Sequence, residues 1–183
     1  MNIVKSVLFS PEVIAQRVKE LGAEITSDYK DKEVLFLGIL KGAFLFMSDL
    51  CRYVDVKMEF DFMEVSSYSG GTYSTGQVRI LKDIDTNIED KNILIVEDIV
   101  DNGLTLDYLV NYIKVRQPRS LKICALLDKR AHRKVLLKID YIGFDCPDEF
   151  VLGYGLDYGE FYRNLPFIGV LNEEFISYPK NVL

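Results

Sequence analysis

The sequence predicts an α/β fold in which a Rossmann-like, mostly parallel sheet is flanked by helices. Two segments of strand length, residues 33–40 (EVLFLGIL) and 91–97 (KNILIVE), are almost entirely apolar, as in strands covered on both faces. Segments with helical spacing alternate with the strand candidates, which is typical of a parallel sheet. Since the chain has 183 residues, of which 49% are hydrophobic, it has room for one sizeable core, and we expect a single domain over residues 1–183.

The first helix is expected at residues 11–28. Ser10 is a suitable N-cap, Pro11 fits the first helical position, and Glu12 is favoured there by the helix dipole. The apolar residues that follow recur at helical spacing: Ile14, Val18, Leu21 and Ile25. We expect these residues to pack against the sheet.

The region between the two apolar strands contains a helix, two strands and a loop. The segment from Gly42 (GAFLFMSDLCRYV) is expected to be helical. Apolar and charged residues alternate over residues 56–62, which predicts a strand with one exposed face. Residues 66–76 (SSYSGGTYSTG) lack a periodic apolar face, so we expect a mobile loop there, followed by a short strand at 78–82.

The second half of the chain continues the alternation. A helix is expected at about 104–115, and strands follow at 120–127 and 139–144, in a strand, helix, strand succession. No internal repeat, charge block or linker interrupts it.

The composition disfavours several classes of protein. The formal net charge is −6, with 22 Lys and Arg against 28 Asp and Glu, whereas a nucleic-acid-binding protein needs a basic face. Cys51, Cys124 and Cys146 are odd in number and widely spaced, so we expect buried free thiols in a reducing compartment rather than disulfides or a zinc site. The single histidine, His132, cannot supply a multi-histidine metal site, and its polar surroundings (KRAHRK) predict an exposed ring.

No segment predicts a membrane span or a targeting signal. The most apolar run, residues 34–46, is interrupted by a lysine and is shorter than the roughly 20 residues that a span requires. The first residues lack a long apolar core followed by a small-residue cleavage site. We therefore expect a cytoplasmic protein with no membrane partner.

The most unusual strand end lies at residues 93–106 (ILIVEDIVDNGLTL). An apolar strand runs into Glu97 and Asp98, Asp101 follows, and a Gly-Leu-Thr turn opens the next helix. The N–H groups of a helix amino terminus favour a phosphate, whereas the carboxylates would repel it unless a cation or hydroxyl groups lie between them. A magnesium-bound sugar phosphate would suit both the helix terminus and the carboxylates. Glu97 and Asp98 are strand neighbours whose side chains face opposite sides, so they suit a ribose diol better than a shared metal ion. The alternative interpretation of this segment is an acidic loop that only caps a helix. The Walker and dinucleotide-binding sequence motifs are absent from the chain.

Residues 96–106 (VEDIVDNGLTL) resemble the phosphoribosyl diphosphate (PRPP) motif of type I phosphoribosyltransferases. Further segments resemble the hypoxanthine-guanine phosphoribosyltransferases of that family, in the same order: Leu40-Lys41-Gly42, Ser67-Tyr68, residues 127–130 (LDKR), 148–154 (DEFVLGY) and 156–158 (LDY), and Arg163. The matching segments are spread over residues 40–163, which makes the resemblance specific. One departure is Asn102, where the family usually has Thr or Ser, so backbone donors and Thr105 are expected to hold the 5′-phosphate instead.

The resemblance implies a purine salvage enzyme that uses Mg²⁺ and converts hypoxanthine or guanine plus PRPP to IMP or GMP plus pyrophosphate. It implies a core of about residues 30–145, a small hood from the two terminal segments, a homo-oligomer (dimer or tetramer), and no nucleic-acid partner. The implied site residues are the general base Asp101, acting at purine N7; Glu97, Asp98, Asn102, Gly103, Leu104 and Thr105 for ribose and phosphate; Lys41, Gly42 and Arg163 for pyrophosphate, with an unusual cis peptide at Lys41; Lys129, Phe150 and Val151 for the purine; Ser67 and Tyr68 for a lid; and Asp157 near the metal and base.

These residues also have ordinary structural explanations. Lys41 could be a surface lysine, Phe150 a core residue, Asp157 a turn acid, and Arg163 half of a surface ion pair. Two other functions stay open: a PRPP-sensing regulator on the same fold that binds nucleic acid through the KRAHRK segment, and a xanthine-preferring phosphoribosyltransferase. A homologue without catalysis is disfavoured because the acids of the motif are present.

Overall fold

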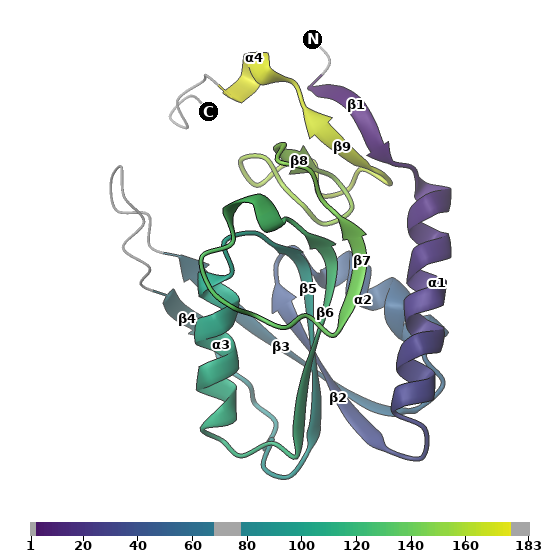
Figure 1. Cartoon of the computed structure of the whole chain (residues 1–183), viewed down its shortest axis with the longest axis vertical. Helices are drawn as coiled ribbons and strands as arrows, with labels where there is room; N and C mark the ends of the chain where they lie inside the picture. The colour runs from purple at the N-terminus through teal and green to yellow at the C-terminus, as the bar shows by residue number, and fades with distance from the viewer. Residues whose placement is uncertain (1–2, 68–77, 177–183) are drawn as a thin grey trace.

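The computed structural model describes residues 3–67 and 78–176, and within them a six-stranded sheet forms the centre (Figure 1). Its strands follow the spatial order β4-β3-β2-β5-β6-β7. Their bounds are β2 Glu33–Leu40, β3 Lys57–Ser67, β4 Val78–Lys82, β5 Asn92–Val100, β6 Ser120–Asp128 and β7 Tyr141–Asp145. Neighbouring strands are parallel except β3 and β4. The expected mostly parallel α/β fold is therefore confirmed.

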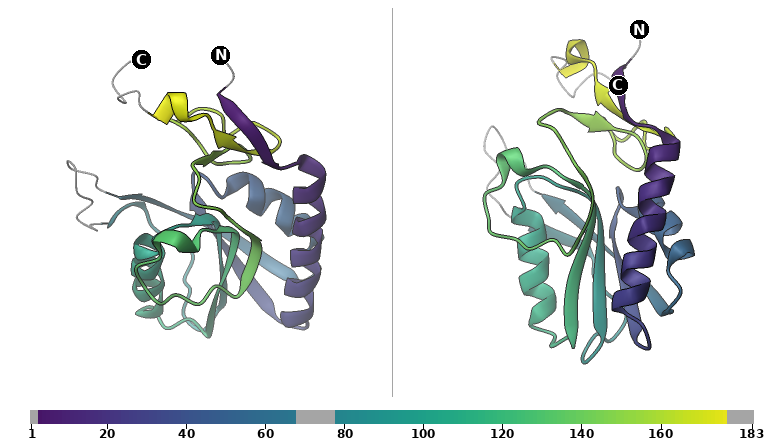
Figure 2. Two further views of the ribbon diagram at one scale, coloured as in Figure 1. Left: turned by 45° about the horizontal axis from the view of Figure 1, so that its top comes forward. Right: turned by 45° about the vertical axis from the view of Figure 1, so that its right-hand side comes forward.

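Helices cover both faces of this sheet (Figure 2). Helices α1 (Pro11–Asp28) and α2 (Phe44–Leu50) pack on one face, and α3 (Leu104–Lys114) packs on the other. Helix α1 begins as expected, because the Ser10 hydroxyl accepts the backbone N–H of Val13 at 3.4 Å. Its four predicted apolar positions are all buried. A 3₁₀ turn at Cys51–Tyr53 follows α2, and none of the helices in the described segments is long and apolar enough to span a membrane.

The loop between β3 and β4 begins later than expected. Strand β3 continues through Ser67, which pairs with Val78 of β4. Ser66 and Ser67 therefore belong to the strand, because their backbones extend the antiparallel ladder to β4. The remainder of the predicted loop, residues 68–76, including the lid residue Tyr68, lies outside the described residues.

Two further local expectations need correction. In β3, Phe60 is 50% exposed whereas Asp61 is buried, because the Asp61 carboxylate accepts backbone N–H groups at 2.7 to 2.9 Å. The connection from β6 to β7 contains the 3₁₀ turn Arg130–His132. Cys51 is half-buried, whereas the other two cysteines are buried and all three are free thiols. His132 is exposed, as expected.

The two terminal segments form a second sheet of three strands with the order β1-β9-β8. Its strands are β1 Val4–Phe9, β8 Val151–Leu152 and β9 Ile168–Leu171, and the short helix α4 (Glu173–Ile176) follows. This sheet lies beyond the carboxyl ends of the central strands (Figure 1). Its buried residues Val151 and Ile168 belong to the same apolar cluster as Ile14 of α1 and Phe46 of α2. The second sheet is thus packed onto the edge at which parallel sheets bind ligands.

Candidate active site

Three segments meet closely around Gly42, at the carboxyl end of β2. The peptide bond between Leu40 and Lys41 is cis. A Cβ atom on Gly42 would lie 1.6 Å from Oδ2 of Asp98, and one on Gly155 would lie 2.1 Å from the Gly42 carbonyl oxygen. The loop after β2 is therefore packed between the end of β5 and the segment that contains Gly155, and only a residue without a side chain fits at Gly42.

Glu97 and Asp98 are two acids whose surroundings in the protein disfavour their charged forms. Strand β5 continues past both, so their side chains leave it on opposite faces, as expected. Within the described residues, Oε2 of Glu97 is buried and has no hydrogen-bond partner. Burial and the neighbouring charge of Asp98 raise the pKa of Glu97 well above its ordinary value. Burial also raises the pKa of Asp98 to about 6, although a backbone N–H bond from Ile99 and the charge of Arg163 oppose this shift. Both carboxyls suit a ligand that brings donors or positive charge.

The turn between β5 and α3 presents a helix amino terminus. Gly103 has a φ of +81°, a left-handed conformation that favours glycine. Oδ1 of Asn102 accepts the N–H of Leu104 at 2.9 Å, so this departure from the family pattern shapes the turn. The N–H groups of the first helical turn, including that of Thr105, lack intrahelical partners and lie at the positive end of the helix. Asp101 is exposed directly before this turn, which is suited to a phosphate.

The three purine candidates lie on β8 and on the segments that flank it and β6. Lys129 follows β6, and its backbone N–H donates to the Val100 carbonyl at the end of β5 at 3.0 Å. Its ammonium donates to the Glu149 carbonyl at 3.1 Å, and its side chain is only 13% exposed. The Phe150 ring is 45% exposed and meets the Tyr158 ring edge-on at 5.8 Å, whereas Val151 is buried in β8. A mostly buried lysine side chain and a partly exposed ring could hold a flat heterocycle with an acceptor on its edge.

The pyrophosphate candidates form an ion-pair cluster. Arg163 pairs with Asp157 at 2.9 Å and donates to the Gly155 carbonyl at 2.7 Å. The Lys41 ammonium pairs with Glu160 at 2.9 Å, and Arg163 lies 3.6 Å from the same carboxylate. The Lys41 hydrogen bond and charge lower the pKa of Glu160. Two cations thus converge beside the Gly42 loop, where a multiply charged anion could exchange with their carboxylate partners.

The geometry joins most of the predicted residues and adds four that the sequence did not single out. The Gly42 loop contacts Asp98, and Lys129 is bonded to the end of β5. The added residues are Asp128, Arg133, Gly155 and Glu160. Asp128 lies within the matched segment 127–130, and Gly155 and Glu160 lie beside the matched segments 148–154 and 156–158, so proximity in sequence to these motifs is a usable signal for all three. The sequence carries no such signal for Arg133, because this residue lies in a basic stretch of the kind that is usually exposed to solvent.

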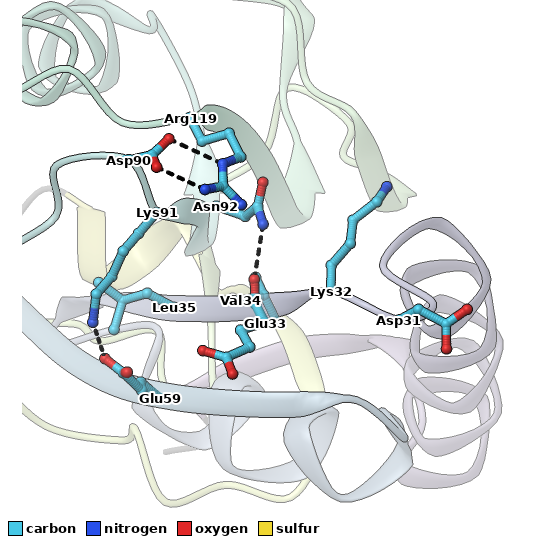
Figure 3. A pocket seen from close by; sticks show the side chains of 10 residues that line it. All are labelled: Asp31, Lys32, Glu33, Val34, Leu35, Glu59, Asp90, Lys91, Asn92 and Arg119. Carbon is cyan, nitrogen blue, oxygen red and sulfur yellow. Dashed lines mark hydrogen bonds and ion pairs between the residues drawn. The ribbon is translucent and has the colours of Figure 1, made fainter.

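A cavity at the opposite end of the sheet is unrelated to these residues (Figure 3). It has a volume of about 320 Å³ and lies where β2 and β5 begin. Two ion pairs lie among its lining residues: Arg119 with Asp90 at 2.7 Å, and Lys91 with Glu59 at 2.5 Å. None of the predicted site residues lines it. Within residues 3–67 and 78–176, no group of three or more His, Cys, Asp or Glu side chains is arranged to hold a metal ion by itself.

Comparison with known proteins adds a family and close relatives. Residues 8–159 match the phosphoribosyl transferase domain. A hypoxanthine-guanine phosphoribosyltransferase of Bacillus subtilis is 55% identical over 168 residues, which cover 92% of this chain and 93% of the relative. One from Streptococcus agalactiae is 51% identical over 96% of this chain and 98% of its own length. The crystal structure of a hypoxanthine phosphoribosyltransferase from Staphylococcus aureus superposes with a TM-score of 0.93 at 50% identity and covers 97% of this chain and 96% of its own.

Proposed function

Because the chain belongs to the phosphoribosyl transferase family, we propose that it transfers the phosphoribosyl group of PRPP to hypoxanthine or guanine. The products are IMP or GMP and pyrophosphate. The observation that carries the proposal is the buried, unpartnered Oε2 of Glu97, on the strand β5 that leads to the phosphate-suited turn and whose last residue, Val100, accepts the Lys129 N–H. Ribose hydroxyls supply the donors that this carboxyl lacks.

The reaction needs positioning and charge stabilisation more than covalent chemistry. A purine nitrogen forms a bond to C1 of PRPP while the C1–oxygen bond breaks and its electron pair leaves with pyrophosphate. Positive charge develops on the ribose ring, and the carboxylates of Glu97 and Asp98 hold its hydroxyls beneath that charge. Asp101 takes the proton that the purine loses at N7. Arg163 and the backbone of the Lys41–Gly42 loop hold the leaving pyrophosphate.

The donor set fits Mg²⁺ that arrives with the sugar diphosphate. Asp157 supplies hard carboxylate oxygens beside the pyrophosphate cations, and Mg²⁺ in such sites is bound by one or two carboxylates together with substrate phosphates. The cation would neutralise charge on the leaving group when bound. The protein contributes orientation: both oxygens of Asp157 are held, one by Arg163 and one by the backbone N–H of Glu160 at 2.9 Å.

Base selection rests on Lys129. A lysine ammonium has only donors, so it pairs with the carbonyl O6 of hypoxanthine or guanine and opposes the amino group of adenine. The Phe150 ring can stack on any purine, so it adds affinity without discrimination. Xanthine carries the same O6, and xanthine preference remains the alternative within this reaction class.

A nucleic-acid-binding regulator is the second candidate, and the basic stretch argues against it. Arg130 pairs with Asp128 at 2.6 Å, His132 contacts Asp148 at 2.8 Å, and Arg133 also pairs with Asp128. Each of these three side chains thus has a carboxylate partner within the protein that competes with a nucleic-acid phosphate. A salt titration with polynucleotide tests this, since a regulator shows binding that weakens steeply with salt.

The direct test is product formation. Purified protein, PRPP and each of hypoxanthine, guanine and xanthine are incubated with Mg²⁺ or with excess chelator, and nucleotide and pyrophosphate are quantified. We expect equal amounts of IMP or GMP and pyrophosphate, with little turnover under chelation. Absence of nucleotide with all three bases would overturn the proposed function.

A further inference from the structure

The Arg133 side chain crosses from the loop after β6 to the end of β5. Its Nε donates to the carbonyl of Asp101 at 2.9 Å, and its Nη2 donates to the carbonyl of Val100 at 3.2 Å. The same Nη2 pairs with the carboxylate of Asp128, which is 3% exposed. The Arg133 side chain is itself only 17% exposed. An arginine from one loop thereby ties together the last residues of two parallel strands.

The backbone places these two segments in the same register. The Lys129 N–H donates to Val100, and the Lys134 N–H donates to the Asn102 carbonyl at 2.9 Å. A Cβ on Gly103 would lie 3.0 Å from Cδ of Arg133, so the arginine stem lies directly against the turn. The loop with Lys129 and the turn with Asp101 therefore form one bonded unit, with Arg133 as its side-chain link.

We propose that Arg133 is a positioning residue that holds Asp101 and the phosphate-binding turn in register with the purine contact Lys129. This inference rests on the proposed function. Arg133 does not itself face the ligands, because its Nε and Nη2 are already engaged with protein acceptors and its side chain is mostly buried. A base displaced by about 1 Å loses on the order of 100-fold in rate, so restraint of the Asp101 backbone matters to turnover.

The fork geometry of arginine is required for this role. Two carbonyls and one carboxylate converge on a planar group with donors in fixed directions. A lysine ammonium at the same place has a single nitrogen on a flexible stem and cannot reach all three acceptors together. Arg133→Lys should therefore restore only part of the function that Arg133→Met loses.

Arg130 offers a matched control on the same loop. It shares the Asp128 carboxylate with Arg133 at 2.6 Å and also approaches Asp145 at 3.4 Å, but its side chain is 65% exposed. Its hydrogen bonds and ion pairs in the described structure do not include the end of β5. Loss of a positive charge beside Asp128 is therefore common to both variants, whereas loss of the restraint on Asp101 is specific to Arg133.

The test combines a double-mutant cycle with hydrogen exchange. We expect Arg133→Met to lower kcat for hypoxanthine about 10- to 100-fold, with Arg130→Met within threefold of the wild type. In the Asp101→Asn background the same Arg133 substitution should lower kcat less than threefold, because the base that it positions is gone, whereas displacement of the phosphate-binding turn should raise the KM for PRPP in both backgrounds. A general structural defect would cost the same factor in both backgrounds, and that result would overturn the inference.

Amide exchange gives a measurement that does not depend on turnover. Arg133→Met should speed exchange in residues 100–106 of the free protein, whereas Arg130→Met should not. If Arg133→Met does not fold, Arg133→Lys replaces it in both experiments. Unchanged exchange and unchanged kcat would contradict the positioning role. An inactive wild type would instead overturn the proposed function, and the exchange result would still decide whether Arg133 restrains the turn.

Discussion

At the scale of single residues, the site contains acids in an environment that opposes their ionisation. The pKa of Asp98 is raised to about 6 from an ordinary value of 3.8, mainly by burial, and burial and the charge of Asp98 raise the pKa of Glu97 well above its ordinary value. Such groups lower the stability of the empty protein while they prepare it for a ligand that brings donors or cations.

Asp98→Asn is predicted to stabilise the ligand-free protein. The native state binds the Asp98 proton more tightly than the unfolded state, so stability falls as pH rises from about 3.8 to about 6 and stays reduced above that window. The asparagine removes this loss, which amounts to roughly 1–3 kcal/mol at pH 8. Denaturant unfolding at pH 8 and pH 4 measures it, and the gain should disappear at the lower pH.

A second carboxyl supplies a control of opposite sign. Hydrogen bonds from Lys122 and Tyr141 lower the pKa of Asp28, so Asp28→Asn should destabilise the protein at neutral pH, with a smaller effect in acid. Equal changes in the free energy of unfolding for both substitutions at pH 8 would contradict the interpretation that ionised Asp98 lowers the stability of the ligand-free protein.

Asp101→Asn is predicted to preserve the fold and PRPP binding but to reduce kcat by about 10² to 10⁴. The amide has nearly the shape of the carboxylate but cannot accept a proton. Steady-state kinetics and a calorimetric titration with PRPP separate the two effects. A kcat close to that of the wild type would remove Asp101 from the role of base.

At the scale of elements, the site depends on how strand ends approach each other. Gly42 illustrates this, because Asp98 of β5 and Gly155 occupy the space on either side of it. The sequence alone predicts a glycine loop after a buried strand, but it does not predict which segments press against the loop.

Gly42→Ala is therefore predicted to weaken PRPP binding and to lower stability by about 1–3 kcal/mol, since the new Cβ would overlap the Asp98 carboxylate. Asp98→Ala in the same chain makes room, so the double variant should be more stable than the sum of the single effects predicts. Thermal unfolding of the four proteins gives the coupling, and strict additivity would show that the loop does not rest on Asp98.

The elements that the sequence predicts well are those with local signals. Helix α1 has a cap, a first-turn proline and an apolar stripe, and β2 and β4 have the expected bounds. Strand β3 was predicted too short at its end, because its last residues owe their extended state to pairing with β4. The burial of Asp61 likewise depends on partners more distant in sequence, the backbone N–H groups of Asp85 and Thr86.

The candidate site divides in the same way. Glu97, Asp98 and the turn to Thr105 can be predicted because strand, acids and helix start lie within one short segment. The assignments of Lys129, Phe150 and Arg163 needed the family resemblance. Neither the local sequence pattern nor the family resemblance identified Arg133, because a basic stretch is usually exposed to solvent. Only the folded chain shows the contacts of Arg133 with Val100 and Asp101.

At the scale of the whole molecule, the two sheets share one apolar cluster. Residues of the terminal strands pack with α1, α2 and the central strands. This packing holds the Phe150 segment over the edge of the sheet where Lys129 and the phosphate-suited turn lie. The residues proposed for base recognition and those proposed for phosphate recognition therefore lie on segments far apart in the sequence, held by one core.

The ratio of kcat/KM for hypoxanthine to that for adenine measures whether the protein selects oxopurines through Lys129. We predict a ratio of roughly 10⁴ or more, because adenine leaves the Lys129 donor facing another donor in a partly dehydrated site. Lys129→Ala should lose activity with hypoxanthine without becoming an efficient adenine enzyme. A wild-type ratio below about ten would contradict both the proposed substrate class and the role given to Lys129.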